Sequence, residues 1–141
     1  MFVFGGHIDF VIVDTDSSDR TTGSTEWHEL AALGPVVVQA GSEEDLFLLT
    51  LSGSTYCSGT AANRAGVVRA LADGKVMAPG EVSFDGAVGA ELRQSHSHQF
   101  VSERLGEGEH NFKIQWRVFA LPTGTTTFHM SHRILTLMRI G

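Results

Sequence analysis

The chain is poor in cysteine, in long apolar runs and in clusters of basic residues, and each shortage excludes a class of structure or partner. Its 141 residues include one cysteine, Cys57, so no disulfide can form within the chain. The apolar runs are short and interrupted, and none approaches the roughly 20 residues that a transmembrane helix needs. The 10 basic side chains are not clustered and the formal net charge is −6, so neither a membrane nor a nucleic acid is expected as a partner.

Recognisable catalytic motifs are missing as well. The sequence contains no Gly-x-Ser-x-Gly elbow, no phosphate-binding loop and no dinucleotide-binding fingerprint. Cys57 lacks the neighbours that are typical of cysteine-dependent enzymes, and a lone cysteine is usually a small buried apolar residue. We therefore expect a protein that is not an enzyme and that needs no cofactor.

The start of the chain differs in character from the rest. Residues 1–7 are apolar and contain two adjacent glycines, without the basic start and long apolar core of a secretion signal. We expect them to form an N-terminal arm that docks on a partner, and residues 8–141 to form a single domain. A chain of this length suffices for one domain and is short for two.

The patterning of the chain predicts an all-β fold. Its 16 glycines disfavour helices, because glycine costs a helix interior about 1 kcal/mol relative to alanine. Short apolar segments alternate with turn residues at the spacing of a sandwich or barrel. The segments predicted as strands are 7–14, 27–30, 36–40, 45–53, 64–71, 82–84, 96–105, 110–118, 125–129 and 133–140, with a loop over 15–24.

One segment has two interpretations. The alanines in and around residues 64–71 are compatible with a helix. The sequence Asp73-Gly74 that follows is typical of a tight hairpin turn, because both residues tolerate a positive φ. We therefore predict a strand here.

The clearest alternation lies in residues 110–118. Every second residue is apolar and the intervening ones are polar, which is the period of a half-buried strand. Trp116 falls on the apolar side, so we expect it in the core rather than stacked on a sugar. The apolar set is Phe112, Ile114, Trp116 and Val118, and the polar set is Asn111, Lys113, Gln115 and Arg117.

Two strands are apolar on both faces, namely residues 45–53 and 133–140. One face of each can meet the sandwich core, and the other needs a second partner, for which a neighbouring copy of the chain is the natural candidate. The residues expected in the core strands or in an interface between copies are Leu46, Leu48, Leu49, Leu51, Phe112, Ile114, Trp116, Ile134, Leu135, Leu137, Met138 and Ile140.

The last third of the chain resembles the jelly-roll domains of phage fibre, tail and head-decoration proteins. Residues 105–117 read Leu-Gly-Glu-Gly-Glu-His-Asn-Phe-Lys-Ile-Gln-Trp-Arg, similar to the turn and strand of those domains. The threonines at 125–127 and the closing segment 133–140 occupy the corresponding later places. More loosely, residues 48–53 look like their central apolar strand and residues 69–74 like their Asp-Gly hairpin.

This resemblance implies a fold and a function. The fold is an antiparallel jelly-roll β-sandwich of about eight to ten strands, similar to the tumour-necrosis-factor and complement globular-head class, whose members are usually homotrimers. The implied function is that of a non-enzymatic virion surface protein, either a capsid decoration protein or a fibre-tip knob, with capsid or tail proteins as partners. Because the domain fills nearly the whole chain, a stand-alone subunit is favoured over a complete fibre.

Two alternative functions depend on possible ligand residues. A module that binds a receptor or a host-surface glycan could use Trp27 and His96. A small cupin-like metalloenzyme could use His96 and His98, which alternate on a predicted strand and so share one face. No third ligand completes that metal set locally, and a pair of polar histidines is the simpler interpretation, as it is for His129 and His132.

Three carboxylates lie at the start of the predicted loop and directly before it. Asp14, Asp16 and Asp19 supply the oxygen ligands that Ca²⁺ prefers. The glycine and the closing glutamate of an EF-hand are absent. An ordinary solvated loop is therefore favoured, and no metal is expected.

Overall fold

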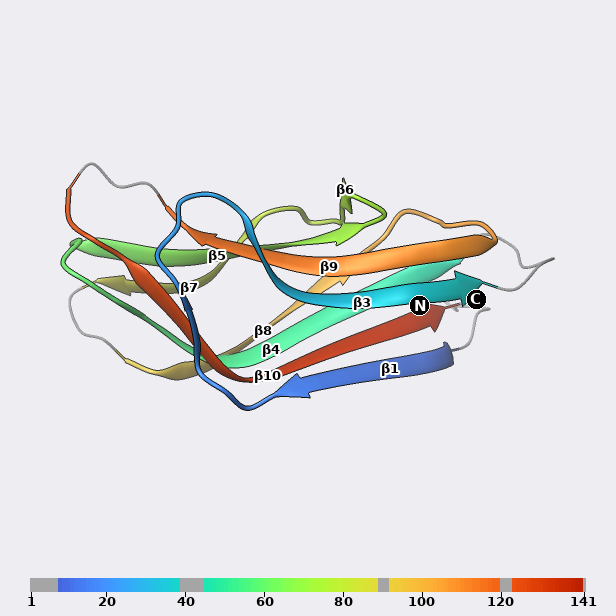
Figure 1. The fold of residues 1–141 in the computed structure, drawn as a ribbon, viewed down its shortest axis with the longest axis horizontal. Coiled ribbons are helices and arrows are strands. Elements are labelled where there is room, and N and C mark those ends of the chain that lie inside the picture. Colours follow the sequence, from blue (N-terminus) through green and yellow to red (C-terminus); the bar gives the residue numbers. More distant parts are fainter. Residues whose placement is uncertain (1–7, 39–44, 89–91, 120–122, 141) are drawn as a thin grey trace, which may run out of the picture.

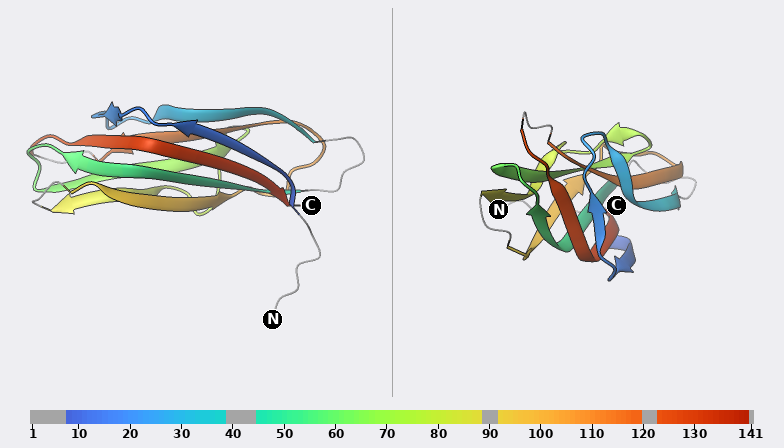
Figure 2. Two further views of the ribbon diagram at one scale, coloured as in Figure 1. Left: turned by 90° about the horizontal axis from the view of Figure 1, so that it is seen from below. Right: turned by 60° about the vertical axis from the view of Figure 1, so that its left-hand side comes forward.

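A computed structural model describes residues 8–38, 45–88, 92–119 and 123–140. Its elements are all strands, which form two antiparallel sheets that pack face to face (Figures 1 and 2). The predicted all-β sandwich is therefore confirmed. The expected arm, residues 1–7, lies outside the described residues. In the described ranges, no helix is long and apolar enough to cross a membrane.

The two sheets have five strands each. Sheet A has the order β1 (Ile8–Asp16), β10 (Thr127–Ile140), β4 (Leu46–Ser58) and β8 (Gln94–Val101), with β2 (Arg20–Thr22) also paired to β10. Sheet B has the order β3 (His28–Val38), β9 (Gly108–Val118), β5 (Asn63–Ala72) and β6 (Lys75–Val76), with β7 (Val82–Val88) also paired to β5.

The strand pairs are nested in the sequence. β5 pairs with β7, β4 with β8, β3 with β9, and β1 with β10, so each pair encloses the one before it. The pairs β5–β7 and β3–β9 lie in sheet B, and the pairs β4–β8 and β1–β10 lie in sheet A. Successive pairs therefore alternate between the two sheets. This wrapping of an antiparallel ribbon around a core is the jelly-roll arrangement.

Aromatic and aliphatic side chains from both sheets fill the core. Phe47, Phe100 and Phe128 of sheet A and Phe112 of sheet B are all fully buried or nearly so. The ring centroids of Trp116 and Phe128 lie 5.4 Å apart, which joins the two layers. The predicted alternation of β9 is confirmed, because its apolar set is buried and its polar set is not.

The segments predicted at 27–30 and 36–40 are not separate strands, since the single strand β3 runs from His28 to Val38. Its register with β9 shifts between Leu33 and Val36, where Pro35 lies. β3 is at the edge of sheet B, so the missing N–H of proline is tolerated there.

The segments predicted at 125–129 and 133–140 also belong to one strand, β10. A β-bulge shifts its register with β4 between Ser131 and Ile134, and His132 within the bulge has a φ of 50°. A bulge adds one residue and so inverts the alternation beyond it, which made one strand look like two.

The predicted loop over residues 15–24 contains more strand than expected. β1 extends to Asp16, and Arg20–Thr22 form β2, a short edge strand on the first half of β10. Similarly, β7 runs from Val82 to Val88 rather than over 82–84 alone.

The hairpin between β5 and β6 is confirmed. Asp73 and Gly74 have φ angles of 51° and 80°, as a tight turn with two left-handed residues requires. The segment that precedes the turn is the strand β5, so the helical interpretation of residues 64–71 is wrong.

Candidate functional site

The outer face of sheet B carries a row of polar side chains. Because Phe112, Ile114 and Trp116 point into the core, the alternate residues of β9 project outward. These outward residues are Asn111, Lys113, Gln115 and Arg117, and all are partly or fully exposed. At about 3.4 Å per residue, this row extends for about 20 Å along the strand.

Trp27 lies at one end of this row, just before β3. The Arg69 guanidinium carbon is 4.4 Å from the centre of the Trp27 ring, and that of Arg117 is 4.9 Å away. The Nε of Arg69 donates to Oε1 of Gln115 at 2.9 Å, and Arg117 forms an ion pair with Glu81 at 2.6 Å. Since Trp27 is partly exposed, we refer to Trp27, Arg69, Gln115 and Arg117 as the Trp27 platform.

A groove lies at the other end of the same row. It has a volume of about 530 Å³ and is lined by Glu29, Ala32, Leu33, Gly34, Asp73, Gly74, Asn111, Phe112 and Lys113. Glu29 lies directly opposite Gln115 in the pairing of β3 with β9, so the groove adjoins the platform. The platform and the groove together form one continuous surface of aromatic, amide and charged groups.

His110 holds the wall of this groove. Its ring nitrogens Nδ1 and Nε2 lie 2.6 Å from Oδ2 of Asp73 and 2.7 Å from the carbonyl oxygen of Gly106. A carboxylate and a backbone carbonyl both accept hydrogen bonds, so this arrangement favours the doubly protonated imidazole, in which both nitrogens donate. Burial lowers the pKa of His110, but the hydrogen bonds to Asp73 and Gly106 outweigh it and raise the pKa above its usual value.

The outer face of sheet A has the opposite character. Within the predicted core and interface set, Leu49, Leu51, Leu135 and Leu137 are fully buried in the sandwich. The alternate residues of β4 and β10 point outward with their neighbours on β1 and β8. The apolar ones form a surface that we call the apolar face: Val13, Leu46, Leu48, Val101, Ile134, Met138 and Ile140.

Exposure on the apolar face is substantial. Val13 is 57% exposed and Ile134 is 45% exposed, while the others are partly buried. Isolated apolar residues are common on protein surfaces, but a contiguous group often marks an interface.

His96 and His98 share one face of β8, and it is the inner face. They pair with Gly53 and Leu51 of β4, which point into the sandwich. His96 Nε2 lies 3.7 Å from Oδ1 of Asp85, and the His98 ring packs against Phe100. In the part of the chain that the structure describes, no three or more His, Cys, Asp or Glu residues are grouped to hold a metal. The two histidines are therefore not joined by a third ligand there.

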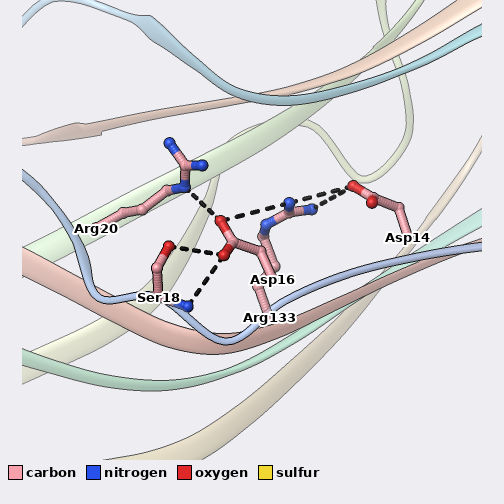
Figure 3. A network of polar contacts seen from close by, with 5 residues as sticks. All are labelled: Asp14, Asp16, Ser18, Arg20 and Arg133. Carbon is pink, nitrogen blue, oxygen red and sulfur yellow. Dashed lines mark hydrogen bonds and ion pairs between the residues drawn. The ribbon is translucent and has the colours of Figure 1, made fainter.

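Arginines hold the carboxylates that were candidates for calcium (Figure 3). Both terminal nitrogens of Arg133 donate to Asp14 at 3.1 Å, and Arg133 also lies 4.0 Å from Asp16. Hydrogen bonds from Ser18 and Arg20 hold the pKa of Asp16 well below its usual value. Two arginines thus already neutralise these two carboxylates, and the network fastens the edge of sheet A.

Asp19 points to different partners. Its carboxylate lies 3.6 Å from Arg93 and 3.8 Å from His129. The His129 ring is stacked on Tyr56 at 4.0 Å and bonded to Ser58, while the exposed His132 lies in the β10 bulge. The three aspartates therefore do not form one ligand set.

Cys57 is buried in the core with 1% of its surface exposed. Burial is the main cause that raises the pKa of its thiol to about 12. A thiol that stays protonated at neutral pH is a poor nucleophile, so the expected role as a small core residue fits this environment.

The pattern of the sequence singled out Trp27 but not its partners. The alternation of β9 already placed Gln115 and Arg117 on the outer face. Arg69 comes from β5, and only the pairing of β5 with β9 brings it to Gln115. No local signal in the sequence connects these three residues to Trp27.

Known proteins resemble this chain in structure but not in sequence family. No protein family matches the chain, and no curated protein matches it either. One solved structure that resembles it is the C-terminal domain of EclA, a sugar-binding protein, with 17% sequence identity over 89% of this chain and 83% of that one. The TM-score is 0.43. A likeness this weak says nothing about what this chain binds.

Proposed function

We propose that this chain is a non-enzymatic module that binds a carbohydrate or a carbohydrate-bearing receptor through the outer face of sheet B. The observation that carries the proposal is the Trp27 platform, where a partly exposed indole adjoins a polar row and a groove. Binding sites commonly combine an aromatic surface with a few well-placed polar groups. A sugar ring offers an apolar face to an indole and hydroxyls to amides, guanidinium groups and carboxylates.

A glycan array followed by titration of the best ligand tests this proposal. Trp27→Ala should weaken binding about 30-fold, because truncating a central aromatic anchor typically costs about 2 kcal/mol. Tyr56→Ala is the matched control, since Tyr56 is a partly exposed aromatic residue with Arg93 over its ring at 4.5 Å, but on sheet A. A blank array, or equal losses in the two variants, would contradict the proposal.

The apolar face supports a second role, self-association. Strands β4 and β10 give one face to the core and present aliphatic side chains on the other. Covering these side chains with another copy would stabilise an assembly by about 25 cal/mol for each Å² of apolar surface removed from water. We propose a homotrimer of this kind on the surface of a virion, as a decoration protein or fibre knob, in line with the resemblance of residues 105–117 and 133–140 to phage jelly-roll domains.

Sedimentation analysis at micromolar concentration tests the assembly. The wild-type chain should sediment as a trimer, and Ile134→Glu should shift it to monomers, because a buried unpaired charge is costly at an interface. Val37→Glu is the control, since Val37 is 63% exposed on the edge strand β3 of the other sheet. A wild-type chain that stays monomeric over this range would overturn the role.

A further inference from the structure

We propose that the Trp27 platform selects saccharides that carry a carboxylate or a sulfate over neutral ones. This proposal rests on the proposed function and adds the chemical class of the ligand. Arg69 is central to this proposal, because its guanidinium carbon lies 4.4 Å from the centre of the Trp27 ring and so is next to any ligand that contacts the indole.

The two arginines of the platform differ in their charge balance. Arg117 has its positive charge offset by Glu81, whose Oε1 lies 2.6 Å away. Arg69 has a hydrogen bond to the neutral amide of Gln115 and its contact with Trp27, but no carboxylate within ion-pair distance among the described residues. Arg69 therefore carries a positive charge without an ion-pair partner among the described residues, in a chain whose net charge is −6.

The donors of Arg69 suit an anion with two oxygens. Its Nε is used by Gln115, which fixes the plane of the guanidinium group. The terminal N–H groups remain for a ligand, and a guanidinium group binds a carboxylate or sulfate through paired hydrogen bonds. Trp27 stays partly exposed beside the two arginines, so part of the indole is accessible to a ligand that also reaches Arg69.

The acidic residues of the same surface do not cancel this charge. Glu29 lies on β3 and Arg69 on β5, with Gln115 of β9 between them. Two strand spacings, or about 10 Å, separate the backbones of these two residues. Asp73 is farther along the row and is held by His110. An anionic group is therefore expected at Arg69, while Glu29 and Asn111 are placed to contact neutral hydroxyls.

The test compares sialyllactose with lactose, and a glucuronate-containing oligosaccharide with its glucose counterpart, by titration of the full-length chain. The acidic member of at least one pair should bind 10-fold or more tightly, and added salt should reduce the difference. Arg69→Gln should remove the preference, so that the ratio of the affinities for the acidic and the neutral sugar falls to about one. Arg93→Gln is the matched control, because it removes an arginine of similar geometry over Tyr56 on the other sheet.

The outcomes separate the two proposals. If acidic and neutral sugars bind equally and Arg69→Gln changes nothing, the preference for anions is refuted while the proposed carbohydrate binding stands. If no saccharide binds and the glycan array is also blank, both are refuted. If Arg93→Gln lowers the preference as much as Arg69→Gln does, the effect reflects overall charge and the assignment to the platform is wrong. Melting curves of all variants show that each one is folded.

Discussion

Replacing Gly66 by alanine is expected to lower the free energy of unfolding by about 3 kcal/mol, at the upper end of the usual cost of overpacking a core. A Cβ atom at Gly66 would lie 2.2 Å from Cδ2 and 2.3 Å from Cγ of the Phe128 ring. Phe128 is fully buried between the sheets, with Trp116 and Phe84 around it. The ring cannot move aside without displacing these neighbours. Urea unfolding of the two proteins measures the difference.

A double-mutant cycle separates steric overlap with Phe128 from the effect that replacing any glycine in a strand would have. In a Phe128→Ala background, itself destabilised by about 4 kcal/mol, Gly66→Ala should cost less than about 1 kcal/mol, because the ring is gone. Gly86→Ala is the control in the neighbouring strand β7, where the added Cβ has nothing closer than 3.5 Å. Equal costs for Gly66→Ala with and without Phe128 would contradict this account of the core.

Raising the pH from 6 to 9 should destabilise the protein through His110. Its pKa is raised in the folded state, so its contribution is complete below the ordinary value of 6.5 and is lost as the pH rises through the folded-state pKa. Hydrogen bonds to a charged group typically contribute about 2 kcal/mol. The free energy of unfolding of the wild-type chain should fall by less than this amount, because burial of the charged imidazole opposes the gain from the hydrogen bonds, whereas that of His110→Gln should start lower and change little.

His28→Gln is the control for this measurement. His28 is exposed and its Nε2 lies 3.0 Å from the hydroxyl of Ser24, so the variant leaves the contacts of His110 with Asp73 and Gly106 intact and should keep the pH dependence that they produce. Because His110 holds Asp73 at the wall of the groove, ligand binding on sheet B should weaken over the same pH range. A wild-type stability that is flat from pH 6 to pH 9 would show that the imidazole is not charged in the folded protein.

The alternation of apolar and polar residues predicted the strands correctly where they are regular. It failed where the pairing between strands is irregular. The alternation of β9 and the Asp73-Gly74 turn are properties of neighbouring residues, and both were read correctly. The bulge at His132 inverts the alternation of β10, and Pro35 interrupts the pattern of β3. Each irregularity divided one strand into two apparent ones, because periodicity is detected only within a continuous register.

The same limit applies to the candidate sites. Trp27 stood out as an aromatic residue near a loop, but its contact with Arg69 depends on pairing between strands far apart in the sequence. The aspartates of residues 14–19 offered oxygen ligands for a cation and were expected in an ordinary solvated loop, but their arginine partners could not be foreseen. Arg133 reaches Asp14 only because β1 and β10 are neighbours in sheet A. Composition indicates which chemistry is available, whereas topology decides which groups meet.

The two outer faces of the sandwich point in opposite directions, and the apolar face lies on one of them and the Trp27 platform on the other. Copies joined through the apolar face would each turn a Trp27 platform away from the shared contact. Several such platforms on one particle act together on a surface that displays many sugars. After one platform has bound a sugar, the other platforms are held close to further sugars at a high effective concentration. The avidity of the assembly can then exceed the affinity of a single platform by about 100-fold or more. Weak, readily reversible recognition at each platform would then be enough for lasting attachment.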